Sequence, residues 1–264
     1  MDGNPWLVQR ARTLPCTRAH MRAITSAVLA LLCSFAALSP ATAATITFAT
    51  EPGSDASGQP VSAQVTFVTS DGQISVLLEN LFVDPTSVSQ NVSGLWFTLA
   101  TPNPLGPGTL TSDTGMHRKI DADGTFTDLG VLDTDWTFSG LLGQFFLDGL
   151  AAGPDFTLVG GAGNNNLYDS ANGSIAGNRP HNPFLANSAL FIIAMSGVTS
   201  ETLVSASLFR FGTNPNGGAI TATCLDCGST SEPDLSLPEP GSLLLLGSGL
   251  IALGRWRGRT RGPA

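Results

Sequence analysis

The sequence predicts an all-β protein with a single antiparallel β-sandwich, jelly-roll-like in type, over residues 44–227. Three observations predict this fold class. Apolar and polar residues alternate with a period of two in several short runs, stretches of helical periodicity are rare, and 30 glycines and 17 prolines interrupt the chain of 264 residues. A body of about 190 residues can bury a sufficient core without a metal.

The clearest element is a hairpin. Val65 and Phe67 alternate with polar residues before the turn Ser70-Asp71-Gly72, and Val76 and Leu78 repeat the pattern after it. Similar runs predict strands at residues 45–49, 94–99, 125–129, 135–139, 157–159, 189–196 and 204–211. In the last of these, the apolar period shifts before Phe209 and Phe211, which indicates either a β-bulge or burial on both faces.

The N-terminal segment has the pattern of a secretory signal peptide over residues 21–43. Met21-Arg22 precedes an almost entirely apolar stretch, and the small residues Ala41 and Ala43 mark a signal peptidase site. Residues 1–20 are polar and arginine-rich. They are either a spurious extension ahead of a true start at Met21 or a long basic beginning of the same signal.

The C-terminal segment has three parts after a polar linker at residues 228–237. Pro238-Glu239-Pro240 is extended because proline does not fit inside a helix. Residues 242–254 are uncharged and mostly apolar, and as a helix they would span roughly 20 Å, which is short beside a hydrocarbon core of ~30 Å. The arginines that follow favour retention on the cytoplasmic side; they are Arg255, Arg257, Arg259 and Arg261.

These three parts, at residues 238–261, resemble the PEP-CTERM sorting signal of Gram-negative bacteria, which is also catalogued as an "ice-binding protein C-terminal" domain. The resemblance implies transient insertion into the inner membrane and processing by an exosortase, a membrane-embedded cysteine transpeptidase. It further implies delivery to the cell surface or the exopolysaccharide matrix. Leu237 to Gly241 is also similar to the Gram-positive sortase signal, but Pro240 stands where that signal has threonine.

Removal of both signals would leave a strongly acidic body. The whole chain has a formal net charge of −8, with four of its twelve basic residues before residue 44 and four after residue 254. Residues 44–237 therefore keep four basic residues against 18 acidic ones, a net charge of −14. Nucleic acid is excluded as a partner by repulsion, whereas divalent cations, cationic polymers and neutral sugars remain suitable.

Two small motifs inside the body are candidate sites. Cys224 and Cys227 can close a local disulfide outside the cell or remain an incidental pair, and two thiols alone cannot complete a zinc site. Asp121, Asp123 and Asp128 are weak calcium candidates, because the stretch begins like a calcium loop but lacks its later ligands. Loop aspartates more often cap turns.

The glycine- and asparagine-rich stretch at residues 160–184 carries Tyr168, Arg179 and His181. It is either a sugar-binding surface or a structured loop whose amides bond to its own backbone. No nucleophile-elbow or zinc-protease pattern surrounds the histidines of the body, so no catalytic or cofactor-binding residue is expected. The sequence thus predicts a non-enzymatic surface or matrix protein that meets signal peptidase and exosortase during export and exopolysaccharide afterwards. The alternatives are a carbohydrate-binding module and, less favoured, a secreted polysaccharide hydrolase.

Overall fold

The computed structural model describes residues 43–141, 143–151, 153–215 and 217–227. This part of the chain is built of β-strands and connecting loops, and its one helical element is the short 3-10 turn η1 (Val88–Gln90). The predicted all-β class is therefore confirmed for the described residues.

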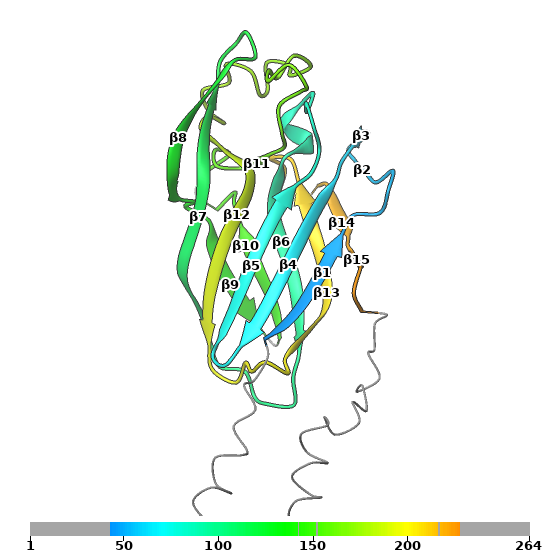
Figure 1. Ribbon diagram of the computed structural model, residues 1–264, viewed down its shortest axis with the longest axis vertical. Coiled ribbons are helices and arrows are strands. Elements are labelled where there is room, and N and C mark those ends of the chain that lie inside the picture. The colour runs from blue at the N-terminus through cyan, green and yellow to red at the C-terminus, as the bar shows by residue number, and fades with distance from the viewer. Residues whose placement is uncertain (1–42, 142, 152, 216, 228–264) are drawn as a thin grey trace, which may run out of the picture. The chain divides into compact units, whose positions relative to one another are not determined.

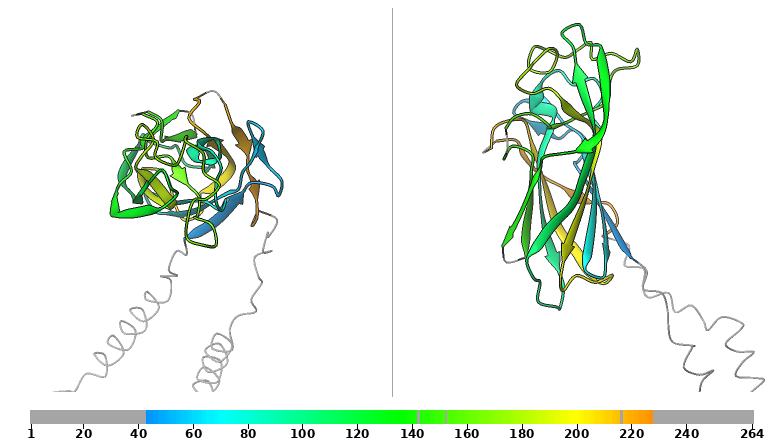
Figure 2. Two further views of the ribbon diagram at one scale, coloured as in Figure 1. Left: turned by 90° about the horizontal axis from the view of Figure 1, so that it is seen from above. Right: turned by 90° about the vertical axis from the view of Figure 1, so that its left-hand side faces the viewer.

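The strands form two layers, shown edge-on in the right-hand view of Figure 2. The first layer has the order β8–β7–β12–β5–β4–β1–β15, with antiparallel neighbours throughout. Its strands are β1 (Ala44–Ala49), β4 (Ala63–Ser70), β5 (Gln73–Asn80), β7 (Gly108–Ile120), β8 (Phe126–Asp133), β12 (Phe184–Met195) and β15 (Thr223–Cys224).

The second layer has the order β9–β10–β6–β13–β14 and lies behind the first in Figure 1. Its strands are β6 (Val92–Ala100), β9 (Thr137–Leu141), β10 (Gln144–Asp148), β13 (Leu203–Phe211) and β14 (Ala219–Thr221). The short β11 (Leu158–Val159) pairs with β6 on one side and β12 on the other, so the two layers are one continuous 13-stranded sheet. A small ribbon of β2 (Asp55–Ala56) and β3 (Gln59–Pro60) stands apart.

This strand order differs from a jelly roll of eight strands in two Greek keys. Three hairpins of consecutive strands, β4–β5, β7–β8 and β9–β10, each stay within one layer. The jelly-roll detail of the sequence prediction is not what the described residues show. The physical reason is that tight turns hold sequence neighbours side by side in the same sheet.

The predicted hairpin is confirmed as β4–β5. Phe67 pairs with Val76 and Val65 with Leu78, and all four side chains are fully buried. Asp71 and Gly72 form the two-residue turn, and Gly72 adopts a φ of 74°, a conformation that glycine accepts without steric cost.

β13 contains a bulge, but it lies earlier in the strand than the shift of period predicted directly before Phe209. The register slips between Val204 and Ala206, so Ser205 is the extra residue on this strand. Beyond the bulge, Phe209 and Phe211 point into the core, while Arg210 lies on the outer face and is nevertheless buried. Burial on both faces, the second explanation of the sequence pattern, is therefore what residues 209–211 show.

The main core fills the space between the layers. Phe67 on β4 lies 5.1 Å from Phe97 on β6, measured between ring centroids. A separate small cluster lies near the 160–183 loop, at the end of the body that is uppermost in Figure 1. This second cluster consists of Ile120, Val159, Tyr168, Ile175 and Phe184.

The two ends of the described chain lie on neighbouring strands. β1 and β15 pair through Phe48 with Cys224 and Ala49 with Thr223, and Leu225 donates a backbone hydrogen bond to Thr47. β15 is the edge strand of the first layer and β1 is next to it, and both lie away from the 160–183 loop (Figure 1).

Candidate functional site

The outer face of the second layer carries an aromatic pair built by strand register. In β6, Leu95 and Phe97 point into the core, so Trp96 points outward. Its cross-strand partners are Phe146 on β10 and Leu208 on β13. Trp96 and Phe146 are both half-buried, and their rings stack with centroids 3.9 Å apart and an interplanar angle of 13°.

Gly94 makes room for this arrangement. It pairs with Asp148 on β10 and with Arg210 on β13, one position along the outer face from Trp96. A Cβ atom at residue 94 would lie 2.8 Å from Cε2 of Phe146 and 3.1 Å from Nε of Arg210. The missing side chain thus lets the Phe146 ring and the guanidinium group lie across β6.

The guanidinium group of Arg210 lies close to both rings. Its guanidinium carbon is 4.9 Å from the Phe146 ring centroid and 5.5 Å from that of Trp96. Its Nη2 donates to the carbonyl of Ser93 at 2.8 Å and forms an ion pair with Asp148. The Arg210 side chain is only 3% exposed, and its charge is balanced by that of Asp148. Cation–π contact and ion pairing together fix the ring geometry and leave this patch electrically neutral.

A hollow of about 260 Å³ opens beside Trp96. Thr98 and Ala206 have short side chains on the same outer face as the large indole ring of Trp96. The hollow lies over these short side chains, beside the indole. Its lining residues are Trp96, Phe97, Thr98, Gln144, Ala206, Ser207, Leu208 and Thr221. No side-chain hydrogen bond joins Thr98, Gln144 or Thr221 to another described residue, so their polar groups are available to a ligand.

A second arginine cluster lies under the 160–183 loop. Arg118 on β7 donates to both carboxylate oxygens of Asp128, at 2.6 and 2.9 Å, and its guanidinium carbon is 3.8 Å from the Phe126 ring centroid. It also donates to the Tyr168 hydroxyl at 3.1 Å, and that hydroxyl donates to the carbonyl of Gly160 at 2.9 Å. Tyr168 is 1% exposed.

The electrostatics of this cluster follow from burial and charge. Burial raises the pKa of the Tyr168 hydroxyl, and the hydrogen bond from Arg118 only partly offsets this. For Arg118, burial alone would lower the pKa, but hydrogen bonds to Asp128 and Tyr168 outweigh it and raise the pKa. Arg118 is therefore a fixed cation and Tyr168 a neutral donor across the physiological range.

The amide-rich loop bonds mainly to itself and to its neighbours. The Asn182 amide donates to the carbonyls of Ile120 and Asn178, while its oxygen accepts from the backbone N–H of Ile120 at 2.8 Å. His181 Nδ1 lies 3.0 Å from the carbonyl of Ser174. Of the three sugar-binding candidates in this loop, Tyr168 is buried, His181 is half-buried and only Arg179 is exposed. The loop is thus a structured cap over the second cluster.

The three calcium candidates have separate partners. Asp121 pairs with Lys119 at 2.5 Å, and Asp128 pairs with Arg118. Asp123 accepts from the hydroxyl of Thr125 at 2.6 Å and from its backbone N–H at 3.1 Å, and these two bonds lower the pKa of Asp123. Among the described residues, no group of three or more His, Cys, Asp or Glu side chains is placed to hold a metal ion.

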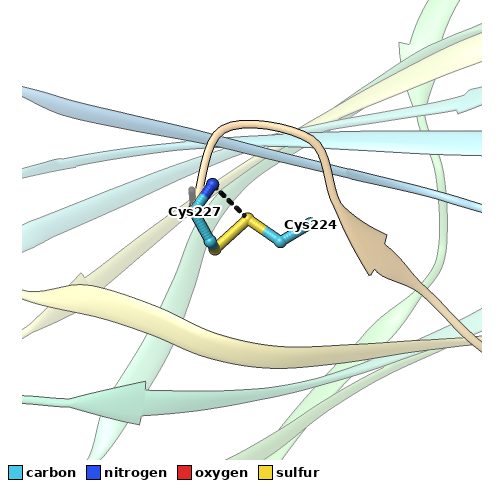
Figure 3. The surroundings of a disulfide bond; sticks show 2 residues. All are labelled: Cys224 and Cys227. Carbon is cyan, nitrogen blue, oxygen red and sulfur yellow. Dashed lines mark hydrogen bonds between the residues drawn. A yellow bond between two sulfur atoms is a disulfide. The ribbon is translucent and has the colours of Figure 1, made fainter. Parts of the chain in front are cut away.

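Cys224 and Cys227 form a disulfide at the end of β15, with their Cα atoms 5.5 Å apart (Figure 3). The backbone N–H of Cys227 also donates to Sγ of Cys224 at 3.0 Å. This small loop is the last described part of the chain.

Several sequence predictions concern residues outside the described part of the chain. They include the segments 1–20 and 228–237, Ala41 of the signal peptidase site, the motif Pro238-Glu239-Pro240, the apolar segment 242–254 and the four terminal arginines. Ala43 is the first described residue and is exposed. Within the described residues, no helix is long and apolar enough to cross a membrane.

Sequence reasoning did not identify Trp96, Phe146, Arg210 or Asp148 as a site. One signal was present: a strand predicted at residues 94–99 with Leu95 and Phe97 inward necessarily turns Trp96 outward. The sequence does not predict that these four side chains meet, because β6, β10 and β13 are far apart in the chain.

Comparisons with known proteins give no further information on this site. No protein-family model, curated protein or solved structure matches this chain.

Proposed function

We propose that this chain is a secreted surface or exopolysaccharide-matrix protein of a Gram-negative bacterium, processed by an exosortase, with a non-enzymatic interaction role. The observation that carries the proposal is the order of three parts at residues 238–261: a Pro-Glu-Pro motif, a short apolar segment and an arginine cluster. The signal peptide predicted at residues 21–43 gives the route of export.

The fold of the body is compatible with cutting at both ends. All the described strands lie between Ala44 and Cys224, so cuts near residue 43 and near Pro238 would leave the two-layer body intact. Since β1 and β15 are neighbours, a body held through its C-terminal end would present the 160–183 loop on the far side from that attachment. The disulfide Cys224–Cys227 would brace the exit of the chain from the body.

Intact-mass analysis of the protein recovered from the surface of a host that has an exosortase tests this proposal. We expect a chain that begins at residue 44 or 45 and ends near Pro238, with the mass of any attached group added. Glu239→Ala should block the C-terminal cut, whereas Glu232→Ala, a matched change in the linker, should not. A surface protein that still ends at Ala264 would contradict exosortase processing.

A carbohydrate-binding module is the second candidate. The amide-rich loop gives it little support, because its aromatic side chain is buried and its amides are bonded within the fold. The observation that favours it is the half-buried Trp96 beside an open hollow on the second layer. A secreted polysaccharide hydrolase stays the less favoured alternative.

A further inference from the structure

We propose that the hollow beside Trp96 binds one or two units of a neutral polysaccharide. The inference deepens the proposed matrix role, because it names the chemistry of the partner. It rests on that role only for the place in which the protein would encounter the sugar. The binding itself depends on the outer face of the second layer and is independent of processing.

The size of the hollow suits a small ligand segment. Its volume of about 260 Å³ is below the range of roughly 300–1,000 Å³ that is usual for drug-sized molecules. It lies on the surface of a sheet and is lined from three adjacent strands and β14, so a polymer could extend beyond it in both directions.

Trp96 supplies the stacking surface. One ring face is covered by Phe146, and the hollow lies toward Ala206 and Leu208 on the opposite neighbouring strand. The face of an aromatic ring is electron-rich, whereas the C–H groups on one face of a pyranose carry partial positive charge. Stacking between them removes apolar surface from water and is attractive electrostatically.

The ring is held in place before any ligand arrives. Phe146 lies against one of its faces, and Arg210, itself fixed by Ser93 and Asp148, lies behind both rings. Binding therefore does not require ordering of the Trp96 side chain, a cost that commonly weakens association. Arg210 acts here as a positioning residue, because it is buried and its donors have partners within the protein.

The lining of the hollow is mostly apolar and carries no charged side chain. Thr98, Gln144 and Thr221 offer hydroxyl and amide groups, which can both donate to and accept from sugar hydroxyls. Arg210 and Asp148, on the same face of the layer, form an ion pair and neutralise one another. Because residues 44–237 carry a net charge of −14, an anionic polysaccharide would also be repelled at long range. Neutral sugars meet all of these conditions.

Calorimetric titration of the full chain tests the inference, in a detergent without sugar head groups. The probes are tetrasaccharides of glucose, mannose, galactose and xylose, with an oligogalacturonate as the anionic comparison. We expect at least one neutral probe to bind and the oligogalacturonate to bind at least tenfold more weakly. Trp96→Ala should weaken binding by about tenfold or more, as truncation of a central aromatic anchor does.

Two further variants make the result decisive. Ala206→Arg should abolish binding, because the arginine would fill the hollow from an exposed position. This variant tests the hollow even if Trp96→Ala proves unstable. Leu190→Ala, at a half-exposed leucine on the outer face of the first layer, should leave the affinity unchanged. Absence of binding to every neutral probe at millimolar concentration would overturn the inference.

Equal affinity of wild type and Ala206→Arg would overturn it as well. If the hollow instead holds a second copy of this chain, Ala206→Arg would convert a dimer into a monomer on size-exclusion chromatography, which would also exclude a sugar site. Failure of the processing experiment would leave these outcomes untouched, so the two proposals fail separately.

Discussion

Arg118 and Arg210 occupy similar chemical settings in two different parts of the fold. Each guanidinium is buried, each lies against an aromatic ring, and each forms an ion pair with an aspartate of the same layer, on the next strand for Arg118 and across β6 for Arg210. The cluster around Arg118 is covered by the 160–183 loop, and Tyr168 seals it. The two rings beside Arg210 are only half-buried, and that of Trp96 borders an open hollow.

The difference shows that the same side-chain chemistry can serve stability or recognition, depending on what covers it. At Arg118 the guanidinium and the Tyr168 hydroxyl bond only within the protein, and the aromatic ring of Tyr168 has no access to solvent. At Arg210 the arginine is equally enclosed, but the rings that it supports remain accessible. Burial of a charge costs free energy because the charge loses its hydration. A buried charge that supports exposed aromatic side chains is therefore expected where the surface has a function.

Removal of the two arginines gives the largest expected effects. Arg210→Met should lower the free energy of unfolding by about 3 kcal/mol, because it leaves a mostly buried Asp148 without its partner. Arg118→Met should cost less, about 1–2 kcal/mol, since Asp128 is 40% exposed and water can solvate it. Urea denaturation of both variants checks this order; a larger loss at Arg118 would contradict the comparison.

Gly160→Ala should disturb the capped cluster alone. A Cβ atom at this position would overlap the backbone oxygen of Phe82, so the chain must shift near the carbonyl that accepts from Tyr168. We expect a loss of about 2 kcal/mol from overpacking, measured by urea denaturation. Gly161→Ala is the matched control, because its nearest neighbour would be Asn187 Oδ1 at 3.7 Å. Equal losses in both variants would show that the cluster is not rigid.

Tyr168→Phe should cost about 1–2 kcal/mol, because it removes one hydroxyl that bonds to both Gly160 and Arg118. Burial raises the pKa of Tyr168 in the folded protein, so the unfolded chain loses this proton first as the pH rises above about 10. Stability from this group is thus present below that pH and is lost above it. Denaturation between pH 8 and 11 should show a steeper decline for wild type than for Tyr168→Phe; parallel profiles would contradict the assignment.

Calcium should have the smallest effect. Asp121, Asp123 and Asp128 each bond to a different neighbour, so we expect no change in melting temperature when millimolar calcium is added. A rise in melting temperature that Asp123→Ala abolishes would restore the calcium site and would place function in the β7–β8 hairpin.

Much of the first layer was readable from the sequence, but its longest strand was not. Strict alternation of apolar and polar residues and a tight turn predict the hairpin β4–β5. By contrast, β7 begins with a run of polar residues, and its strand conformation comes from pairing with β12 and β8 on its two sides. Backbone hydrogen bonding to distant partners leaves no period in the local sequence.

The sequence by itself determined the local properties of this protein: which residues face the core of each regular strand, where turns form, and the order of parts in the C-terminal signal. These depend on neighbours within a few residues. Only the tertiary structure decided that Gly94, Phe146 and Arg210 meet at Trp96, and that Tyr168 is covered while Trp96 is not. Those associations depend on the register of strands separated by many residues, and register is set by the packing of the whole core.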